Sequence, residues 1–599
     1  MGESSKSIRI GNAQAFWGDR ADAAAEMLFQ EPELDYLTLD YLAEVSMSIL
    51  AMQRERDPEA GFARDFVEVI RSLVPYWASG GRCRVIANAG GLNPRGCAEA
   101  CKKALEEGGC RPLKIGVVSG DDVLESLRSA TGDPAGKTFR NLDTGAAIGD
   151  VRDRLVTANA YVGAAPIVKA LADGADIVIT GRVADPSLVV APCIHHFGWK
   201  DDDWNHLAGA TVAGHLIECG TQVTGGISTD WLEVPDPGHI GFPIVEVADD
   251  GSCVVTKPRG SGGRVTAMTV KEQLVYEIGD PGNYLSPDVA VSFHSLELDD
   301  LGGDRVRVSG AMGKPRPDTY KVSATFRDGY RAAGTLTVIG RSASDKAYRI
   351  SRLVYARVEE AGGKFSGTST EWLGSNDCHK AIVRMAVEAE SRDTVERFSR
   401  ELMPFITAGP PGTTGYAEGR PRVHPLFRYW PCVVDRNDVT PHIEFVDSAD
   451  CRGLKPQSPW PPTESAPARS GPPWSDATVE PWQAPRAEEP RQLYDIACAR
   501  SGDKGINANV GIIARTEEAW PLLQSWLTAE RVQRYVPASF NKSVDRYELP
   551  NLRAINFVLH GVLKNGLMTD AQGKGLGQML LEMQLPADAV RSITAARRG

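Results

Sequence analysis

The sequence lacks several features that would place it in a common class. Its 11 cysteines form no Cys-x-x-Cys pair, which argues against a structural zinc site. The first residues carry neither the basic nor the apolar region of a secretory signal, and no apolar run is long enough to span a bilayer. We therefore expect a cytoplasmic protein without a membrane partner, whose cysteines are mostly small buried hydrophobic residues.

Nucleotide-binding motifs are also missing. No Gly-x-Gly-x-x-Gly follows the first expected strand with an acidic residue roughly twenty positions further on. No Gly-x-x-x-x-Gly-Lys-Ser/Thr motif occurs either. These absences disfavour NAD and ATP and leave the cofactor unknown. The formal net charge of -12 argues against nucleic acid as a partner, although a local cluster of cations could still hold a small anionic ligand.

The composition is that of a soluble globular protein with more than one domain. Hydrophobic residues make up 42% of the 599 residues and charged residues 24%. Between Gly453 and Pro490 ten prolines indicate an extended linker. We predict a main domain over residues 1–452, with a candidate division near residue 230, a Pro-rich linker over 453–490 and a small α+β domain over 491–599. Within the last we expect a helix in WPLLQSWLTAERVQRYV and strands that include RAINFVLHGVL and GLGQMLLEMQL.

The first third of the chain alternates short apolar runs with polar loops and helical segments. We expect strands at 8–10, 36–39, 84–87, 114–118 and 177–180. This alternation predicts an α/β domain with a mostly parallel sheet and Rossmann-like strand–helix units. In such a sheet ligands bind outside the carboxyl ends of the strands. The polar residues that would gather there are Asp19, Arg20, Asp40, Glu44, Asn88, Asn93, Asp121, Arg182 and Asp185.

Each of these residues also has a structural interpretation. Asp and Asn are common in turns because they bond to nearby backbone groups, and we favour helix capping for Asp121 and Asp122. For Asn88 and Asn93 we favour ligand contact, because Gly90-Gly91 between them lets the backbone approach a bound group. Arg182 and Asp185 follow the most apolar strand and either contact a ligand or pair with each other.

A second constellation lies in ATVAGHLIECGTQVTGG. His215, Glu218 and Cys219 are spaced i, i+3 and i+4 and would share one helix face. They could bind a metal with a fourth ligand, supply a general base, or offer Cys219 as a nucleophile beside His215. The alternative is a partly buried helix with an ion-pairing Glu and an inert Cys.

Two glycine-rich loops could hold an anion. KPRGSGGR carries Lys257, Arg259 and Arg264, although a solvated hairpin has the same composition. In the tail, SGDKG is followed by Asn507 and Asn509. Lys504 in this loop could meet an anionic group or complete the site of the main domain from across the interface.

Seven segments together resemble the acyclic terpene utilisation A family over nearly the whole chain. They are Gly18-Asp19-Arg20, LDYLTLDYLAE, NAGGLNP, ANAYVGAAPIVKALADGADIVITGRVADPSL, GHLIECGTQVTGG, YEIGDPGNYLSPDV and, in the tail, ARSGDKGINANVGIIAR. The resemblance implies a ferredoxin-like tail domain. It also implies a link to the breakdown of acyclic terpenes, a route that passes through branched acyl-CoA esters by carboxylation, hydration and C–C cleavage.

The hypothesis that follows is a lyase or hydratase acting on a branched acyl-CoA thioester or the corresponding acid. Asp185 or Glu218 would be the base, and Arg182, Asn88 and Asn93 would stabilise the oxyanion. The first strand end would add Asp19 and Arg20 to the site. Lys504, Asn509 or the Lys257–Arg264 loop would hold the carboxylate or the CoA phosphates. A hydrolase that uses Cys219 is a variant, and a non-catalytic acyl-CoA-binding scaffold for a partner enzyme is the alternative. We also expect a homo-oligomer.

Overall fold

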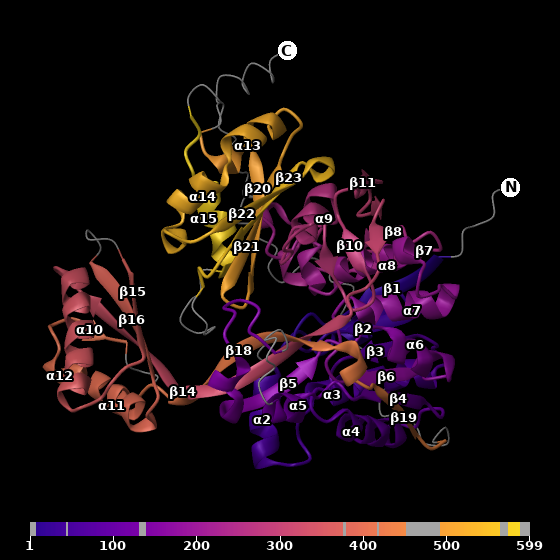
Figure 1. Cartoon of the computed structure of the whole chain (residues 1–599), viewed down its shortest axis with the longest axis horizontal. Helices are drawn as coiled ribbons and strands as arrows, with labels where there is room; N and C mark the ends of the chain where they lie inside the picture. Colours follow the sequence, from indigo (N-terminus) through magenta and orange to yellow (C-terminus); the bar gives the residue numbers. More distant parts are fainter. Residues whose placement is uncertain are drawn as a thin grey trace.

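The computed structural model describes residues 7–43, 46–130, 139–374, 379–415, 419–450, 491–563 and 573–586. Glu44 and the expected linker 453–490 lie outside these residues, and the predicted domain boundaries stay a prediction. Figure 1 shows a main body of helices packed around a large sheet, a lobe beside it, and a C-terminal domain above both.

The five strands expected from the sequence form the parallel centre of the large sheet. Each coincides with a short run of buried apolar residues. In spatial order they are β1 (Ser7–Asn12), β2 (Tyr36–Leu39), β3 (Arg84–Ala87), β6 (Ile177–Thr180) and β4 (Lys114–Ser119).

The sheet as a whole is mixed, which corrects the expectation of a mostly parallel sheet. Five antiparallel strands extend it at its two edges: β7 (Ile244–Ala248), β8 (Cys253–Thr256), β12 (Val306–Ser309) and β11 (Glu297–Asp300) beyond β1, and β19 (His442–Asp447) beyond β4. The turn Asp249-Asp250-Gly251 joins β7 to β8, with Gly251 at a φ of 81°. This Asp-Gly turn between β-branched runs is a hairpin signal. The Rossmann-like character of the strand–helix units is not confirmed.

Helices cover both faces of this sheet because the side chains of each strand alternate between the faces. In β6, Ile177 and Ile179 join one apolar core and Val178 joins the other. The first core packs against α1 (Ala23–Gln30), α3 (Asp65–Ala78) and α4 (Pro94–Glu107). The second packs against α6 (Ala165–Ala172), α7 (Ser187–Phe197), α8 (Trp204–Ile217) and α9 (Ala267–Leu274). The remaining helices of the main body are α2 (Ser46–Arg56) and α5 (Leu124–Ser129).

A 21-residue strand, β14 (Thr319–Ile339), joins the main body to the lobe (Figure 1). Its first half pairs with β5 (Leu155–Ala160) and β18 (His424–Asp435), and its second half with β16 (Lys380–Ala389). The register shifts between Arg327 and Tyr330. The lobe has its own apolar core between this sheet and two helices. Its other elements are α10 (Ala343–Glu360), β15 (Gly367–Leu373), α11 (Arg392–Leu402), α12 (Phe405–Ala408) and β17 (Thr413–Thr414).

A small three-stranded sheet and the C-terminal domain complete the structure. The small sheet contains β9 (Tyr284–Leu285), β10 (Ala290–Ser292) and β13 (Met312–Lys314). The C-terminal domain is an antiparallel sheet in the order β20 (Ala497–Lys504), β21 (Asn507–Ala514), β23 (Ala554–Leu559) and β22 (Val544–Leu549). Its helices are α13 (Trp520–Trp526), α14 (Ala529–Tyr535) and α15 (Leu576–Leu581).

The helix α15 contradicts the strand expected in GLGQMLLEMQL. Its buried residues, Leu576, Gly577, Leu580 and Leu581, recur at helical rather than alternating spacing. Among the described residues, no helix combines the length and apolar character needed to cross a bilayer.

The C-terminal domain packs so closely against the main domain that adding one methyl group at the contact tests the packing. A Cβ on Gly511 of β21 would lie 2.2 Å from Val275 Cγ2 in the main domain. We expect Gly511→Ala to destabilise the protein by about 1–3 kcal/mol through overpacking, seen as a lower thermal unfolding midpoint. Gly279→Ala, where a Cβ meets nothing within 4 Å, is the control. Equal midpoints for the two variants would contradict this close packing.

Candidate active site at the junction of the two domains

The turn after β6 is held in place by a buried aspartate. A Cβ on Gly181 would lie 2.2 Å from Asp121 Oδ1, so only glycine lets this carboxylate approach the turn. Asp121 Oδ2 accepts bonds from the backbone N–H of Arg182 at 2.9 Å and from Asn159 Nδ2 at 2.8 Å. Burial raises the pKa of Asp121 to about 6, against the lowering effect of these donors. Asp121 therefore fixes the position of the Arg182 backbone.

Arg182 is the buried cation of the site, with only 3% of its surface exposed. Its Nη1 donates to the carbonyl of Leu42, and its Nη2 lies 3.0 Å from Asp185 Oδ1. Its guanidinium lies 4.2 Å from the centre of the Tyr161 ring. A buried charge is tolerated only when it is paired and hydrogen-bonded, and these contacts meet that condition.

Asn88 positions an acid beside Arg182. It is fully buried; its Nδ2 donates to Asp40 Oδ1 at 2.6 Å, and its Oδ1 accepts from the backbone N–H of Tyr41 at 2.7 Å. Burial and the neighbouring Asp185 raise the pKa of Asp40 well above its usual range, although Arg182 opposes them. Asn88 thus contacts the polar cluster through Asp40.

Four carboxyl groups of this cluster have raised pKa values: Asp40, Asp185, Glu218 and Glu277. Burial is the main cause for each, and Asp185 and Glu277 further raise the pKa of Glu218. The Asp185 side chain is 30% exposed, whereas that of Glu218 is 15% exposed. Of Asp185 and Glu218, Asp185 is therefore the more open to solvent.

His215 and Glu218 form a pair at the end of α8. His215 Nδ1 lies 3.1 Å from Glu218 Oε1, and His215 Nε2 lies 3.0 Å from the carbonyl oxygen of Gln273. Burial raises the pKa of the Cys219 thiol well above its usual range, so the thiolate needed for nucleophilic attack is disfavoured. Over the described part of the chain, no group of three or more His, Cys, Asp or Glu side chains could hold a metal ion.

Two lysines from distant segments approach the carboxyl groups. Lys504, at the end of β20 in the C-terminal domain, lies 5.8 Å from the centre of the Tyr284 ring. Lys321 of β14 lies 5.3 Å from the centre of the Tyr161 ring. Burial raises the pKa of Asp185, and the charges of Arg182, Lys321 and Lys504 oppose that rise. The cluster therefore joins the sheet edge, β14 and the C-terminal domain.

The β20–β21 hairpin that carries Lys504 docks through small and amide side chains. A Cβ on Gly502 would lie 2.4 Å from Glu277 Cγ, and one on Gly505 2.3 Å from Asp143 Oδ2. Asn509 Oδ1 accepts a 2.7 Å bond from the backbone N–H of Glu277. Glu277 has a φ of 54°, a conformation that costs a non-glycine residue about 1–3 kcal/mol. The amide of Asn509 thus holds the strained backbone of a cluster acid.

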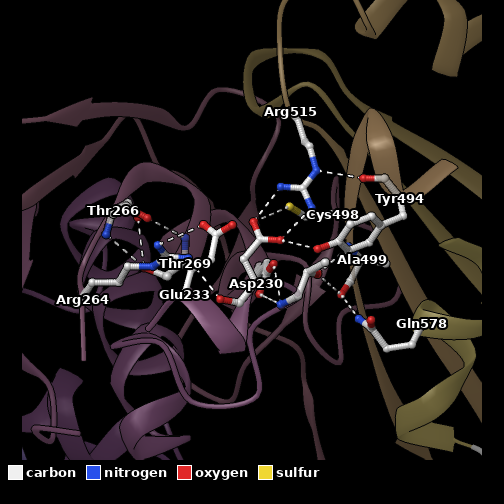
Figure 2. Close-up of polar contacts among 12 residues, drawn as sticks. Asp230, Glu233, Arg264, Thr266, Thr269, Tyr494, Cys498, Ala499, Arg515 and Gln578 are labelled. Atoms are coloured by element: carbon white, nitrogen blue, oxygen red, sulfur yellow. Dashed lines mark hydrogen bonds and ion pairs between the residues drawn. The ribbon is translucent and has the colours of Figure 1, made fainter. Parts of the chain in front are cut away.

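A second contact anchors the C-terminal domain on the main domain (Figure 2). Arg515 makes a two-pronged ion pair with Asp230, at 2.6 and 2.8 Å, and Tyr494 Oη donates to the same carboxylate at 3.3 Å. Thr229 and Ala499 exchange two hydrogen bonds beside it. Bidentate pairs of this kind fix geometry as well as adding energy. They hold the hairpin with Lys504 over the cluster.

Three residues expected at the site lie in local structural contacts instead. Asp19 accepts from the backbone N–H groups of Ala15 and Arg20 at 3.2 and 3.1 Å. Arg20 pairs on the surface with Asp22 and Glu26. Asn93 caps α4 through Gly96 N–H at 2.9 Å. The polar side chains that follow β1 therefore bind groups of their own loop and of the next helix.

The KPRGSGGR loop is likewise occupied by contacts within the protein. Lys257 is buried and bonds to the carbonyl of Ser261 at 2.8 Å and to Asp304 at 3.2 Å. Arg259 is exposed, and Arg264 contacts the Asp230 carbonyl and Glu233, both in the main domain (Figure 2). Two surface grooves of about 690 and 440 Å³ lie elsewhere and include no residue of the carboxyl cluster.

Sequence reasoning missed three contributors to the cluster. Glu277 stands in the quoted segment YEIGDPGNY, yet its left-handed backbone has no sequence signal. Lys321 and Tyr161 meet because Tyr161 N–H donates to the Lys321 carbonyl at 2.8 Å, beside the pairing of β5 with β14. Only the register of β5 against β14 shows that Lys321 and Tyr161 are neighbours.

A family model described as acyclic terpene utilisation family protein AtuA matches residues 8–445, and the AtuA ferredoxin-like domain matches residues 491–586. The chain belongs to the AtuA family. The resemblance stated from the sequence is thereby confirmed, including the ferredoxin-like C-terminal domain of the AtuA-family chain.

Other comparisons add little. A VAO-type flavoprotein from Myceliophthora thermophila C1 aligns at 14% identity over 60% of this chain and 51% of that chain. Its TM-score of 0.11 carries no argument about fold or function. The chain thus spans about half the length of that structure. No curated protein matches the chain.

The buried acid Glu272, near the domain junction, makes the stability of the protein depend on pH. Burial raises the pKa of Glu272 to about 7, although Thr229 N–H bonds to it at 3.2 Å. The folded state retains this proton at pH values where the unfolded chain has lost it, so stability falls as pH rises from about 4.5 through 7. We expect Glu272→Gln to raise the free energy of unfolding by roughly 2–3 kcal/mol at pH 8 and by little at pH 4–5.

Urea unfolding at the two pH values measures this difference. The exposed Glu359→Gln is the control and should shift stability equally at both. An equal effect of Glu272→Gln at both pH values would show that the Glu272 carboxyl is not held protonated.

Proposed function

We propose that this AtuA-family chain is a lyase or hydratase of acyclic terpene utilisation, acting on a branched acyl thioester or the corresponding acid. The observation that carries the proposal is the set of carboxyl groups with raised pKa values around Arg182 and Lys504. Both reaction types require proton transfer at a carbon or hydroxyl and stabilisation of an enolate-like oxygen.

The two acids Asp185 and Glu218 have different environments, which suits different roles. The charges of Arg182, Lys321 and Lys504 act to keep Asp185 ionised, and Asp185 is the more exposed of the two. Glu218 lies deeper, and neighbouring acids favour its protonated form. Pairs of acids whose surroundings push their pKa values apart divide base and acid roles. Asp185 is the general base for one proton, and Glu218 exchanges the second proton with the substrate.

The cations favour an anionic or carbonyl substrate. Arg182 is buried with its charge engaged by Asp185, Asp40 and the Leu42 carbonyl, so it sets the field of the site. Lys504 and Lys321 stand over tyrosine rings near Asp185. A carboxylate, or the oxyanion of a thioester enolate, is the group that such cations stabilise.

The first test is turnover and binding by Asp185→Asn with branched hydroxyacyl-CoA esters, branched unsaturated acyl-CoA esters and the free acids. We expect kcat to fall by about 100-fold or more, because a general base typically contributes 10²–10⁴, while substrate affinity changes by less than about tenfold. Asp122→Asn is the matched control, since Asp122 lies at the neighbouring strand end and its Oδ1 accepts a bond from Leu124 N–H.

Full activity of Asp185→Asn would refute the proposed base. Tight binding of the thioester by the wild type without any turnover would refute the enzyme and favour an acyl-CoA-binding scaffold.

The second test removes the cation supplied by the C-terminal domain. Lys504→Met should weaken binding of the anionic substrate by about 10- to 100-fold, the range expected for a charge-assisted bond. It should also raise the pKa of Asp185, because the charge of Lys504 lowers it, and so move the acidic limb of the rate profile to higher pH. Lys103→Met, on the surface helix α4, is the control. Unchanged affinity and pH profile would exclude Lys504 from the site.

A further inference from the structure

We propose that Glu218 and His215 form a carboxylic acid–imidazole proton relay, in which Glu218 exchanges protons with the substrate through Oε2 and with His215 through Oε1. This inference rests on the proposed function and assigns a further residue to it. It begins with the two contacts of the His215 ring, which has 2% of its side-chain surface exposed.

The Gln273 carbonyl determines the tautomer of His215. A carbonyl oxygen can only accept, so His215 Nε2, 3.0 Å away, must carry a proton. In the neutral ring Nδ1 then has a lone pair and faces Glu218 Oε1 at 3.1 Å. A hydrogen bond between those two atoms requires one proton, and it lies on Glu218 if the ring is neutral.

The surroundings place that proton on the carboxyl group. Burial and the charge of Lys504 lower the pKa of His215 to about 4, whereas the Gln273 carbonyl and Glu277 act to raise it. Burial, Asp185 and Glu277 raise the pKa of Glu218, against Lys504 and Arg182. Tyr284 and Phe293 cover the ring at centroid distances of 5.7 and 5.9 Å. The neutral pair is therefore the form present near pH 7.

The second oxygen of Glu218, Oε2, is the atom that would contact the substrate. Glu218 Oε2 is buried, and no hydrogen-bond partner reaches it among the residues that the structure describes. Leaving a buried carboxyl oxygen without a partner is unfavourable, because the oxygen has lost its hydrogen bonds to water. A donor on the substrate, either a hydroxyl or an acidified C–H group, would fill this position.

The relay moves two protons and leaves Glu218 neutral. The substrate gives its proton to Oε2, and the electron pair of the broken bond stays on the substrate. Oε1 passes its own proton to His215 Nδ1, so the imidazolium holds the charge while Nε2–H keeps its bond to Gln273. The low pKa of His215 makes the imidazolium short-lived, so the same path returns the proton. A hydratase or lyase needs such a reversible exchange within one turnover.

The test measures the resting protonation state before any substrate is added. Infrared difference spectra of the wild type and Glu218→Gln at pH 7 should show a protonated carboxyl band that the variant lacks. The exposed Glu359→Gln should retain it. In nitrogen NMR of labelled protein, the imidazole signal that disappears in His215→Asn should be that of a neutral ring protonated at Nε2.

Activity then separates a relay from a structural role. The side-chain oxygen of His215→Asn can still accept a bond from Glu218 but cannot take its proton. We expect this variant to keep the carboxyl band while turnover falls by about 100-fold or more and the solvent deuterium effect drops, because fewer protons move together. Wild-type-like turnover in His215→Asn would overturn the relay. A resting His215 that is an imidazolium in the wild type would overturn it as well.

The two proposals fail in distinguishable ways. A missing carboxyl band with intact turnover would overturn the relay and leave the proposed function. A carboxyl band and Nε2–H tautomer in a protein that turns over none of the acyl substrates would overturn the proposed function, and with it the catalytic use of the pair. If Glu218→Gln does not fold, the NMR signal of His215 in the wild type still decides the protonation state.

Discussion

The buried charge of Arg182 is the constraint on which the junction depends. Arg182 is only 3% exposed, so its guanidinium needs carboxylates and carbonyl oxygens nearby, and it obtains them from two segments: the β2 loop and its own turn. Asp121 of the β4 loop holds the backbone N–H of the same residue. Each partner is itself desolvated by this arrangement. The acids that balance the arginine therefore acquire raised pKa values as a direct result of the packing.

The C-terminal domain has a structural and an electrostatic part in this arrangement. Its glycines allow the hairpin to approach the Glu277 segment, and Asn509 holds the backbone of Glu277. The same hairpin adds the charge of Lys504 to a cluster rich in carboxyl groups. Docking and the proton affinity of the cluster are consequently linked, because undocking would remove a cation and expose the acids together.

Sequence patterns predicted the centre of the fold because local and global preferences agree there. Strands such as 36–39 and 177–180 are buried on both faces, and their apolar runs are visible without any partner. The rule that ligands gather at strand ends also brought Arg182, Asp185 and Asn88 into one neighbourhood. It did not distinguish Asn88, which orders Asp40, from Asn93, which caps a helix, since both stand in the same kind of loop. Lys321 could not be found this way because its position depends on long-range strand register.

The course of β14 shows how the lobe is connected. Its chain leaves the main body after Arg327 and returns at Phe427, and these two residues are directly paired across neighbouring strands. In topological terms the lobe is an insertion at the tip of a β-hairpin. Because both ends of the insertion meet at one point, the lobe can differ in size or surface without shifting the register that places Lys321.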